Sequence, residues 1–239
     1  MCTVTYTPQS KGFVLTSNRD ENSLRSTTAP QKYQFGGTTL CYPKDSLSNG
    51  SWIAMSNKGR VVCLLNGAFI SHEKKEFHTN SRGTVLLESA KVNTDPFQLF
   101  SNDSLANTEP FTLLTIDFND HEITCFSELI WDGNDKHYRT LDPNEFYIWS
   151  SVTLYSNENR KERKVWFKKF LNANCHNPSA ADLIQFHSKE HSVDSSVNLI
   201  MEREGNLKTV STTQIVHDGM TLKMNYFDLI EQTNYLIEL

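Results

Sequence analysis

The chain opens with MCTVTYTPQSKGFVLTSNRDE, residues 1–21, and this stretch indicates the fold class. Apolar and polar residues alternate from Thr3 to Tyr6 and again from Phe13 to Thr16, which is the pattern of half-buried strands. The intervening residues Pro8 to Gly12 have the composition of a turn. The sequence therefore predicts an antiparallel hairpin at the N-terminus.

Groups of strands and helices alternate along the rest of the chain. The segments 17–49 and 67–82 are polar and are predicted to be loops. Because hairpin turns dominate, we predict an α+β fold with mostly antiparallel sheets in a single domain over 1–239. Further strands are predicted at 51–55, 60–66, 111–116, 122–126, 138–141, 146–150, 207–215, 220–226 and 234–238, and helices at 84–91, 95–100, 158–172 and 179–188.

Composition narrows the class of partner. The chain has 239 residues with 23 Lys and Arg against 28 Asp and Glu, a net charge of −5. Nucleic acid is therefore not expected as a partner, because phosphate binding needs a surplus of clustered cations. No run approaches the roughly 18 apolar residues of a membrane span, and the N-terminus lacks a signal-peptide pattern. We expect a cytoplasmic protein without a membrane span.

The five cysteines are widely spaced, and no pair has the CxxC spacing of a zinc or redox motif. In a reducing compartment they are free thiols. Cys63 and Cys125 lie within predicted strands and are expected in the core. The remaining cysteines are Cys2, Cys41 and Cys175.

Cys2 is the most informative of these residues. Removal of Met1, which is usual before a small side chain, would leave Cys2 with a free α-amino group. That group has a pKa of about 7.7–8.0 and the thiol one of about 8.5. One residue would then supply both a nucleophile and the base that activates it.

The predicted hairpin returns its second strand beside Cys2, and this strand ends in Asn18-Arg19-Asp20-Glu21. A guanidinium favours the thiolate, and a carboxylate can hold the α-amine. The alternative is a set of surface ion pairs, each contributing about 0–1 kcal/mol.

Asn18-Arg19-Asp20-Glu21 resembles the motif that names the NRDE family, which includes the transport-and-Golgi-organisation type proteins. Other elements follow in the family's order over about residues 1–90. They are Met1-Cys2, GSWIAMS at 50–56 followed by Gly59-Arg60, Asn66 at the end of the next strand, and Ser81-Arg82-Gly83.

The resemblance implies an N-terminal-nucleophile (Ntn) hydrolase-like fold, a four-layer αββα sandwich with two mostly antiparallel sheets. Cysteine members similar to bile-salt hydrolases and penicillin V acylases cleave non-peptide amide bonds through an N-terminal cysteine. It also implies that Arg19 and Asp20 assist the nucleophile and that Asn66 contributes to the oxyanion hole. Four further residues are expected to support the substrate or the oxyanion: Asn18, Trp52, Arg82 and Ser151.

Two positions depart from the family pattern. Ser151 stands where members often carry an asparagine, and Val210 stands where many carry an arginine. Losing an oxyanion-hole donor costs about 10²–10³ in rate. Two hypotheses follow. The first is a cysteine amidohydrolase or acyltransferase that forms a thioester on Cys2. The alternative is a non-catalytic ligand-binding or trafficking protein, because eukaryotic relatives are linked to Golgi organisation and haem handling.

The other polar clusters are predicted to be structural. His72 and His78 lie in a polar loop without metal-ligand spacing, so no metal site is predicted. His187 and His191, and the mixed-charge run 160–164, are predicted to be on the surface. No nucleotide or other cofactor is predicted. The expected ligand is a small-molecule amide or acyl compound, and the oligomeric state is left open.

Overall fold

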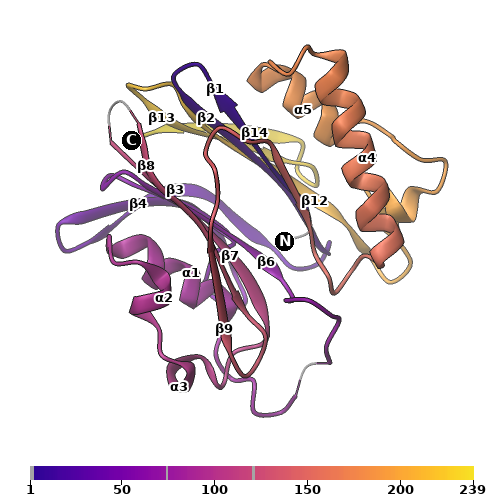
Figure 1. Ribbon diagram of the computed structural model, residues 1–239. Coiled ribbons are helices and arrows are strands. Elements are labelled where there is room, and N and C mark those ends of the chain that lie inside the picture. The colour runs from indigo at the N-terminus through magenta and orange to yellow at the C-terminus, as the bar shows by residue number, and fades with distance from the viewer. Residues whose placement is uncertain (1–2, 74, 120–121) are drawn as a thin grey trace. The chain divides into compact units, whose positions relative to one another are not determined.

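The structure is a computed structural model that describes residues 3–73, 75–119 and 122–239. The chain forms two compact units, and each contains one sheet (Figure 1). The first unit runs up to Arg25 and resumes at Asn144–Glu238, and the second consists of Ser26–Pro143 with Leu239. The prediction of a single domain over 1–239 stays a prediction.

The N-terminal hairpin lies inside the sheet of the first unit. Thr3 pairs with Asn18 at one end of the hairpin, and Gln9 pairs with Gly12 at the turn. Over the described residues this sheet has seven strands, which pair in the order β10 (Tyr147–Ser150), β1 (Thr3–Gln9), β2 (Gly12–Asn22), β12 (Leu207–His217), β13 (Leu222–Asp228) and β14 (Thr233–Glu238), with β11 (Glu202–Arg203) beside β12.

Two helices, α4 (Asn157–Ala173) and α5 (Ala180–Ser188), pack on one face of this sheet (Figure 1). Ser156 and Ser179 cap their N-termini by accepting hydrogen bonds from backbone N–H groups. The short 3-10 helix η1 (Ser195–Val197) follows. The core between helices and sheet is apolar and is formed mainly by Val14, Phe167, Leu171, Leu183, Phe186 and Leu199.

The second unit contains a sequential antiparallel sheet. Over the described residues its seven strands pair in chain order: β3 (Thr27–Phe35), β4 (Thr38–Asp45), β5 (Ile53–Ser56), β6 (Arg60–Asn66), β7 (Phe111–Phe118), β8 (Ile123–Trp131) and β9 (Lys136–Thr140). The predicted α+β class with two mostly antiparallel sheets is confirmed.

The helix α1 (Arg82–Lys91) packs on the second sheet through Val85, Leu86, Leu87 and Ala90. The same cluster contains buried side chains of β4 to β8, among them the large Trp131. Two one-turn helices follow, α2 (Pro96–Leu99) and α3 (Asn102–Leu105). The predicted helices at 84–91, 95–100, 158–172 and 179–188 are all present.

The predicted loop over 17–49 is wrong for most of its length. β2 continues to Asn22, and β3 and β4 form a hairpin around Gly36-Gly37. β3 lies at the edge of its sheet and is rich in exposed polar residues. Tyr33 and Phe35 pack against the core, but this apolar face is too short to predict a strand over 27–35. Pro30 lies at the irregular step between Thr28 and Gln31, where a missing N–H is tolerated.

Arg60 is the principal buried charge of the second unit. Its side chain is fully buried and forms a two-pronged ion pair with Asp117, with N–O distances of 2.5 and 2.7 Å. The guanidinium also donates to the carbonyls of Ser89, Val92 and Thr94, just where α1 ends. Arg60 therefore ties β6, β7 and the end of α1 together.

Replacing Arg60 by Ala should lower the free energy of unfolding by about 3–5 kcal/mol, because it leaves a carboxylate and three carbonyls without their donor. Urea unfolding measures this change. As a control, Lys223→Ala breaks an exposed 3.8 Å pair with Glu238, and it should change stability by less than about 1 kcal/mol. Equal effects of the two variants would contradict this interpretation of Arg60.

The prediction that His187 is on the surface is wrong. Its ring is fully buried, with Nε2 2.8 Å from the Thr5 hydroxyl and Nδ1 3.1 Å from Asn18 Oδ1. Burial is the main cause that lowers the pKa of His187 to about 3, with a smaller contribution from the Arg163 charge. The neutral ring donates through Nδ1 and accepts through Nε2.

Stability should therefore depend on pH through His187. Its pKa in the unfolded chain is 6.5, so between pH 6.5 and about 3 the unfolded chain binds one more proton. The contribution is complete above pH 6.5 and is lost as pH falls, at up to about 1.4 kcal/mol per pH unit. In urea unfolding across this range, His187→Gln should flatten the slope by about one proton. An unchanged slope in His187→Gln would contradict this.

Candidate active site

The residues predicted to form the active site lie in both units, and each group is described within its own unit. Cys2, the predicted nucleophile, lies outside the described residues. The described part of β1 begins at Thr3, which pairs with Asn18 of β2 on one side and with Ser150 of β10 on the other. The predicted motif Asn18 to Glu21 thus begins opposite the first described residue.

The motif is a buried polar strand, and its side chains alternate between the two faces of the sheet. Asn18 and Asp20 contact groups on the face that carries α4 and α5. Arg19 and Glu21 share the opposite face, as expected from the two-residue period of a strand. The sequence places Arg19 and Asp20 next to each other, but their side chains point in opposite directions.

Asp20 is held by two hydroxyl groups. Tyr155 Oη donates to Oδ2 at 2.5 Å, and Thr209 Oγ1 donates to Oδ1 at 2.6 Å. The residue is only 5% exposed. Because both carboxylate oxygens accept hydrogen bonds, the orientation of this side chain is fixed.

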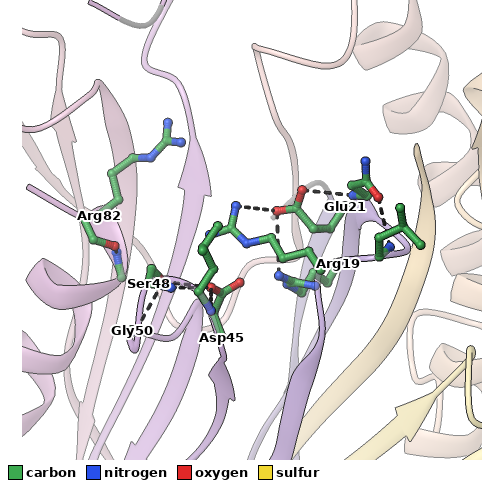
Figure 2. A network of polar contacts seen from close by, with 12 residues as sticks. Arg19, Glu21, Asp45, Ser48, Gly50 and Arg82 are labelled. Atoms are coloured by element: carbon green, nitrogen blue, oxygen red, sulfur yellow. Dashed lines mark hydrogen bonds and ion pairs between the residues drawn. The ribbon is translucent and has the colours of Figure 1, made fainter. Parts of the chain in front are cut away.

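Arg19 is buried as well, and its guanidinium faces Glu21 at 3.7 Å. Glu21 also pairs with Arg25 at 3.3 Å, so one carboxylate lies between two guanidinium groups (Figure 2). The predicted alternative of surface ion pairs fits Arg25, which is partly exposed, but does not fit the buried Arg19.

A bulge in β12 lies opposite this motif. Thr209 pairs with Asp20 and Ser211 pairs with Arg19, so Val210 is an extra residue between them. Bulges of this kind redirect side chains and are common beside active sites. Val210, one of the two departures from the family pattern, is the buried residue at that step.

Asn18 uses its whole amide group inside the first unit. Nδ2 donates to the carbonyls of His187 and Leu199 at 3.0 and 2.8 Å. Oδ1 accepts from Thr212 Oγ1 at 3.0 Å and from the Nδ1–H of His187. These contacts join β2 to α5, to β12 and to the segment after η1, which gives Asn18 a structural function.

Ser151 directly follows β10 and is 1% exposed. Its hydroxyl lies 2.9 Å from Thr153 Oγ1, and its carbonyl accepts from the N–H of Tyr155 at 3.2 Å. Ser151 thus begins the turn that brings Tyr155 to Asp20.

In the second unit, two sequence motifs meet through glycines. A Cβ at Gly50 would lie 2.7 Å from the Gly83 carbonyl carbon, and one at Gly83 would lie 2.9 Å from the backbone N of Ser51. Neither position therefore tolerates a side chain without a shift of backbone. This contact packs the segment leading to Trp52, which is 5% exposed, against the start of α1.

The turn before Gly50 is fixed by Asp45. Its Oδ1 accepts from the backbone N–H of Ser48 at 2.8 Å and from the Ser48 hydroxyl at 3.0 Å (Figure 2). The Asp45 N–H in turn donates to the carbonyl of Gly50 at 2.9 Å. These hydrogen bonds order the turn that precedes Trp52.

Asn66 is half-buried at the end of β6, opposite Phe111. Arg82 is the first residue of α1, and its guanidinium lies 3.4 Å from Glu109 Oε1. Glu109 Oε2 is also 3.4 Å from His72 Nε2. In the described part of the chain, no group of three or more His, Cys, Asp or Glu residues is arranged to hold a metal ion.

The sequence matches the family model described as Transport and Golgi organisation 2 over residues 1–226. The chain belongs to the Transport and Golgi organisation 2 family. A search of curated protein sequences gives no significant match.

Solved structures resemble this family member over its full length. The Caenorhabditis elegans N-acylethanolamine-hydrolyzing acid amidase ortholog has a TM-score of 0.59 at 11% identity, covering 99% of this chain and 100% of that one. A variant of the conjugated bile acid hydrolase from Clostridium perfringens has 0.59 at 10%, covering 99% and 92%. Penicillin V acylase from Agrobacterium tumefaciens has 0.55 at 9%, covering 100% and 86%.

At these identities the likeness shows the fold alone. The Ntn-hydrolase-like fold that the sequence resemblance implied is confirmed for this member of the Transport and Golgi organisation 2 family. Of the helices in the described residues, none combines the length and the apolar character needed to cross a bilayer.

Three residues around Asp20 were not predicted from the sequence: Tyr155, Thr209 and Arg163. The run 160–164 was predicted to be a solvated face, which is wrong for Arg163, because its side chain is fully buried. The sequence does contain a signal for this burial, because Arg163, Phe167 and Leu171 lie four residues apart and therefore on one face of α4.

Asn18 offers a test of its structural function. Asn18→Ala leaves several buried polar groups without partners, so the free energy of unfolding should fall by about 2–4 kcal/mol. Urea unfolding is the measurement, and Asn172→Ala, at an exposed position of α4, should change stability by about 0.5 kcal/mol or less. An Asn18→Ala variant as stable as the wild type would show that the network is dispensable.

Proposed function

We propose that this protein is a cysteine Ntn hydrolase that cleaves a non-peptide amide bond, or transfers its acyl group, through a thioester on Cys2. The observation that carries the proposal is the fold likeness over nearly the whole chain to an acid amidase, a bile acid hydrolase and a penicillin acylase. In this chain the residue that we assign as the nucleophile is Cys2, which follows Met1.

The reaction proceeds in two balanced steps once Met1 is removed. Cys2 Sγ attacks the amide carbonyl, and its proton passes to the α-amino group of the same residue. The tetrahedral intermediate collapses to a thioester, and the leaving amine takes that proton. Water then attacks the thioester, giving one proton to the α-amine, which returns it to Sγ as the acid departs.

Asp20 is proposed to hold the α-amino group. Its two hydroxyl partners, Tyr155 and Thr209, support this role, because a carboxylate fixed at both oxygens keeps one orientation throughout the reaction. The roles of Arg19 in favouring the thiolate and of Asn66 in binding the oxyanion stay predictions. The support of the substrate or the oxyanion by Asn18, Trp52, Arg82 and Ser151 also stays a prediction. So does a cytoplasmic location.

The other thiols differ sharply in accessibility, which decides how the proposal is tested. Cys41 and Cys63 are fully buried, and burial raises the pKa of Cys41 to about 12. Burial also raises the pKa of the half-buried Cys125. Cys175 is exposed, so it is the thiol that would compete with Cys2 for an electrophile.

The test is therefore made in a Cys175→Ser background. The purified protein is weighed by intact mass spectrometry before and after brief treatment with iodoacetamide, and the adduct is mapped. We expect a mass that lacks Met1 and one adduct on Cys2, formed at least about ten times faster than on any other thiol.

The matched control is Cys2→Ser in the same background, which should lose the fast adduct and retain the fold. Retained Met1, or slow labelling spread over several cysteines, would contradict the proposal.

The alternative function is reversible binding of a small ligand without catalysis. It is favoured by one observation: the buried Ser151 hydroxyl lies against Thr153, and serine has no amide donor to offer an oxyanion. If the protein only binds a ligand, the Cys2→Ala variant should still retain that ligand. If the protein is an enzyme, the covalent acyl adduct should be absent from this variant.

A further inference from the structure

We propose that Tyr155 and Arg163 are positioning residues for the nucleophile, joined in one buried network that holds both the residue after Cys2 and the carboxylate of Asp20. This inference rests on the proposed function, because it assigns these residues a purpose through Cys2 and its α-amino group.

The first link is the hydroxyl of Tyr155. Tyr155 is 2% exposed and lies in the turn between β10 and α4. Its phenol donates to Asp20 Oδ2 at 2.5 Å, while Thr209 takes the other oxygen. Hydrogen bonds to an ionised acceptor are about twice as strong as neutral ones, so Tyr155 is a principal restraint on the carboxylate.

The second link is the contact of Arg163 with the ring of Tyr155. The central guanidinium carbon lies 3.4 Å from the ring centroid. This cation–π geometry orients the ring and draws electron density from it, which makes the phenol a better donor. The central guanidinium carbon of Arg203 lies 5.2 Å from the centroid of the same ring, so two cations lie close to Tyr155.

The third link runs from Arg163 to the nucleophile strand. The same guanidinium donates to Oγ1 of Thr3, the residue that follows Cys2 in the sequence. Its other nitrogen donates to the carbonyls of Val197 and Asn198 at 2.9 and 2.6 Å. With the Tyr155 ring stacked on it, the fully buried guanidinium cannot move independently of these partners.

Together these contacts form a continuous chain, Thr3–Arg163–Tyr155–Asp20, inside the first unit. One end holds the side chain of Thr3, the residue next to Cys2, and the other end holds the carboxylate proposed to bind the α-amine of Cys2. The phenol of Tyr155 contacts both Arg163 and Asp20, and its hydrogen bond sets the direction of the carboxylate, which is what alignment of a nucleophile requires.

The effect on reactivity has a definite sign. The Asp20 carboxylate favours the α-ammonium form of Cys2, and an adjacent ammonium favours the thiolate. Loosening Asp20 weakens both effects, so less thiolate forms at a given pH. Among the described residues, the charged and titratable groups that face the Tyr155 ring and hydroxyl include Arg163, Arg203 and Asp20.

The experiment measures the rate of alkylation of Cys2 by iodoacetamide from pH 5 to 9 in the full-length Cys175→Ser protein, with and without Tyr155→Phe. We expect the midpoint of the pH profile to move up by about 0.5–1 pH unit in Tyr155→Phe, which removes one hydrogen bond to a charged group. Tyr226→Phe is the matched control. That buried phenol faces Asp228 at 3.5 Å and should leave the midpoint unchanged.

The failures are distinguishable. If the protein without the Tyr155 substitution retains Met1, or if its Cys2 is alkylated slowly, the proposed function and this inference are both overturned. A wild-type Cys2 that labels fast, with an unchanged midpoint in a folded Tyr155→Phe variant, overturns this inference alone. Should Tyr155→Phe not fold, Arg163→Lys replaces it. That variant keeps the charge but loses the planar stack, and it should shift the midpoint in the same direction. An unchanged midpoint would again overturn the inference.

Discussion

The pairing of β2 with β12 is the constraint on which the first unit depends. The two strands run antiparallel from Phe13 opposite His217 to Asn22 opposite Leu207, and a single bulge at Val210 interrupts them. Because of that bulge, Thr209 lies opposite Asp20 and donates to its carboxylate. At the polar end of β2, the buried side chains of Asn18 and Asp20 are hydrogen-bonded to groups of β12, α5 and the turn before α4, which offsets the cost of burying them.

The alternation of side chains along β2 divides the motif residues Asn18 to Glu21 into two pairs on opposite faces of the sheet. Asn18 and Asp20 face the helices, where Asn18 stabilises the fold and Asp20 is held in one orientation. Arg19 and Glu21 face the other way and form an ion-pair chain with Arg25. The four polar side chains of the motif thus have polar partners on both faces of the sheet, although Asn18, Arg19 and Asp20 are buried.

The sequence was sufficient to predict a strand or a helix wherever apolar residues recur with a regular period. The N-terminal hairpin, the β5–β6 and β7–β8 hairpins and the four predicted helices follow from such patterns, and all are present. It was insufficient where burial is achieved by polar groups. The end of β2 looks like a loop because its residues are hydrophilic, yet Arg19 is 3% exposed.

Contacts between residues far apart in the sequence also limited what could be predicted about burial. Arg163 lies in a run of charges that is exposed at neighbouring positions. Its spacing with Phe167 and Leu171 places it on the buried face of α4, but its polar partners, Thr3 and Tyr155 among them, come from other elements. His187 is hidden in the same way by Thr5 and Asn18. For the candidate site, the motif residues were predicted from the resemblance, whereas Tyr155 and Thr209 emerge only from the fold.

A thioester on Cys2 is the most direct test of the mechanism. The Cys175→Ser protein is mixed with p-nitrophenyl acetate, quenched in acid after short intervals, and weighed intact. The mechanism predicts one acetyl group on Cys2, removed by hydroxylamine, that appears early and is lost as water releases the acid. The absence of any acyl group on Cys2, or a stable label on another residue, would contradict it.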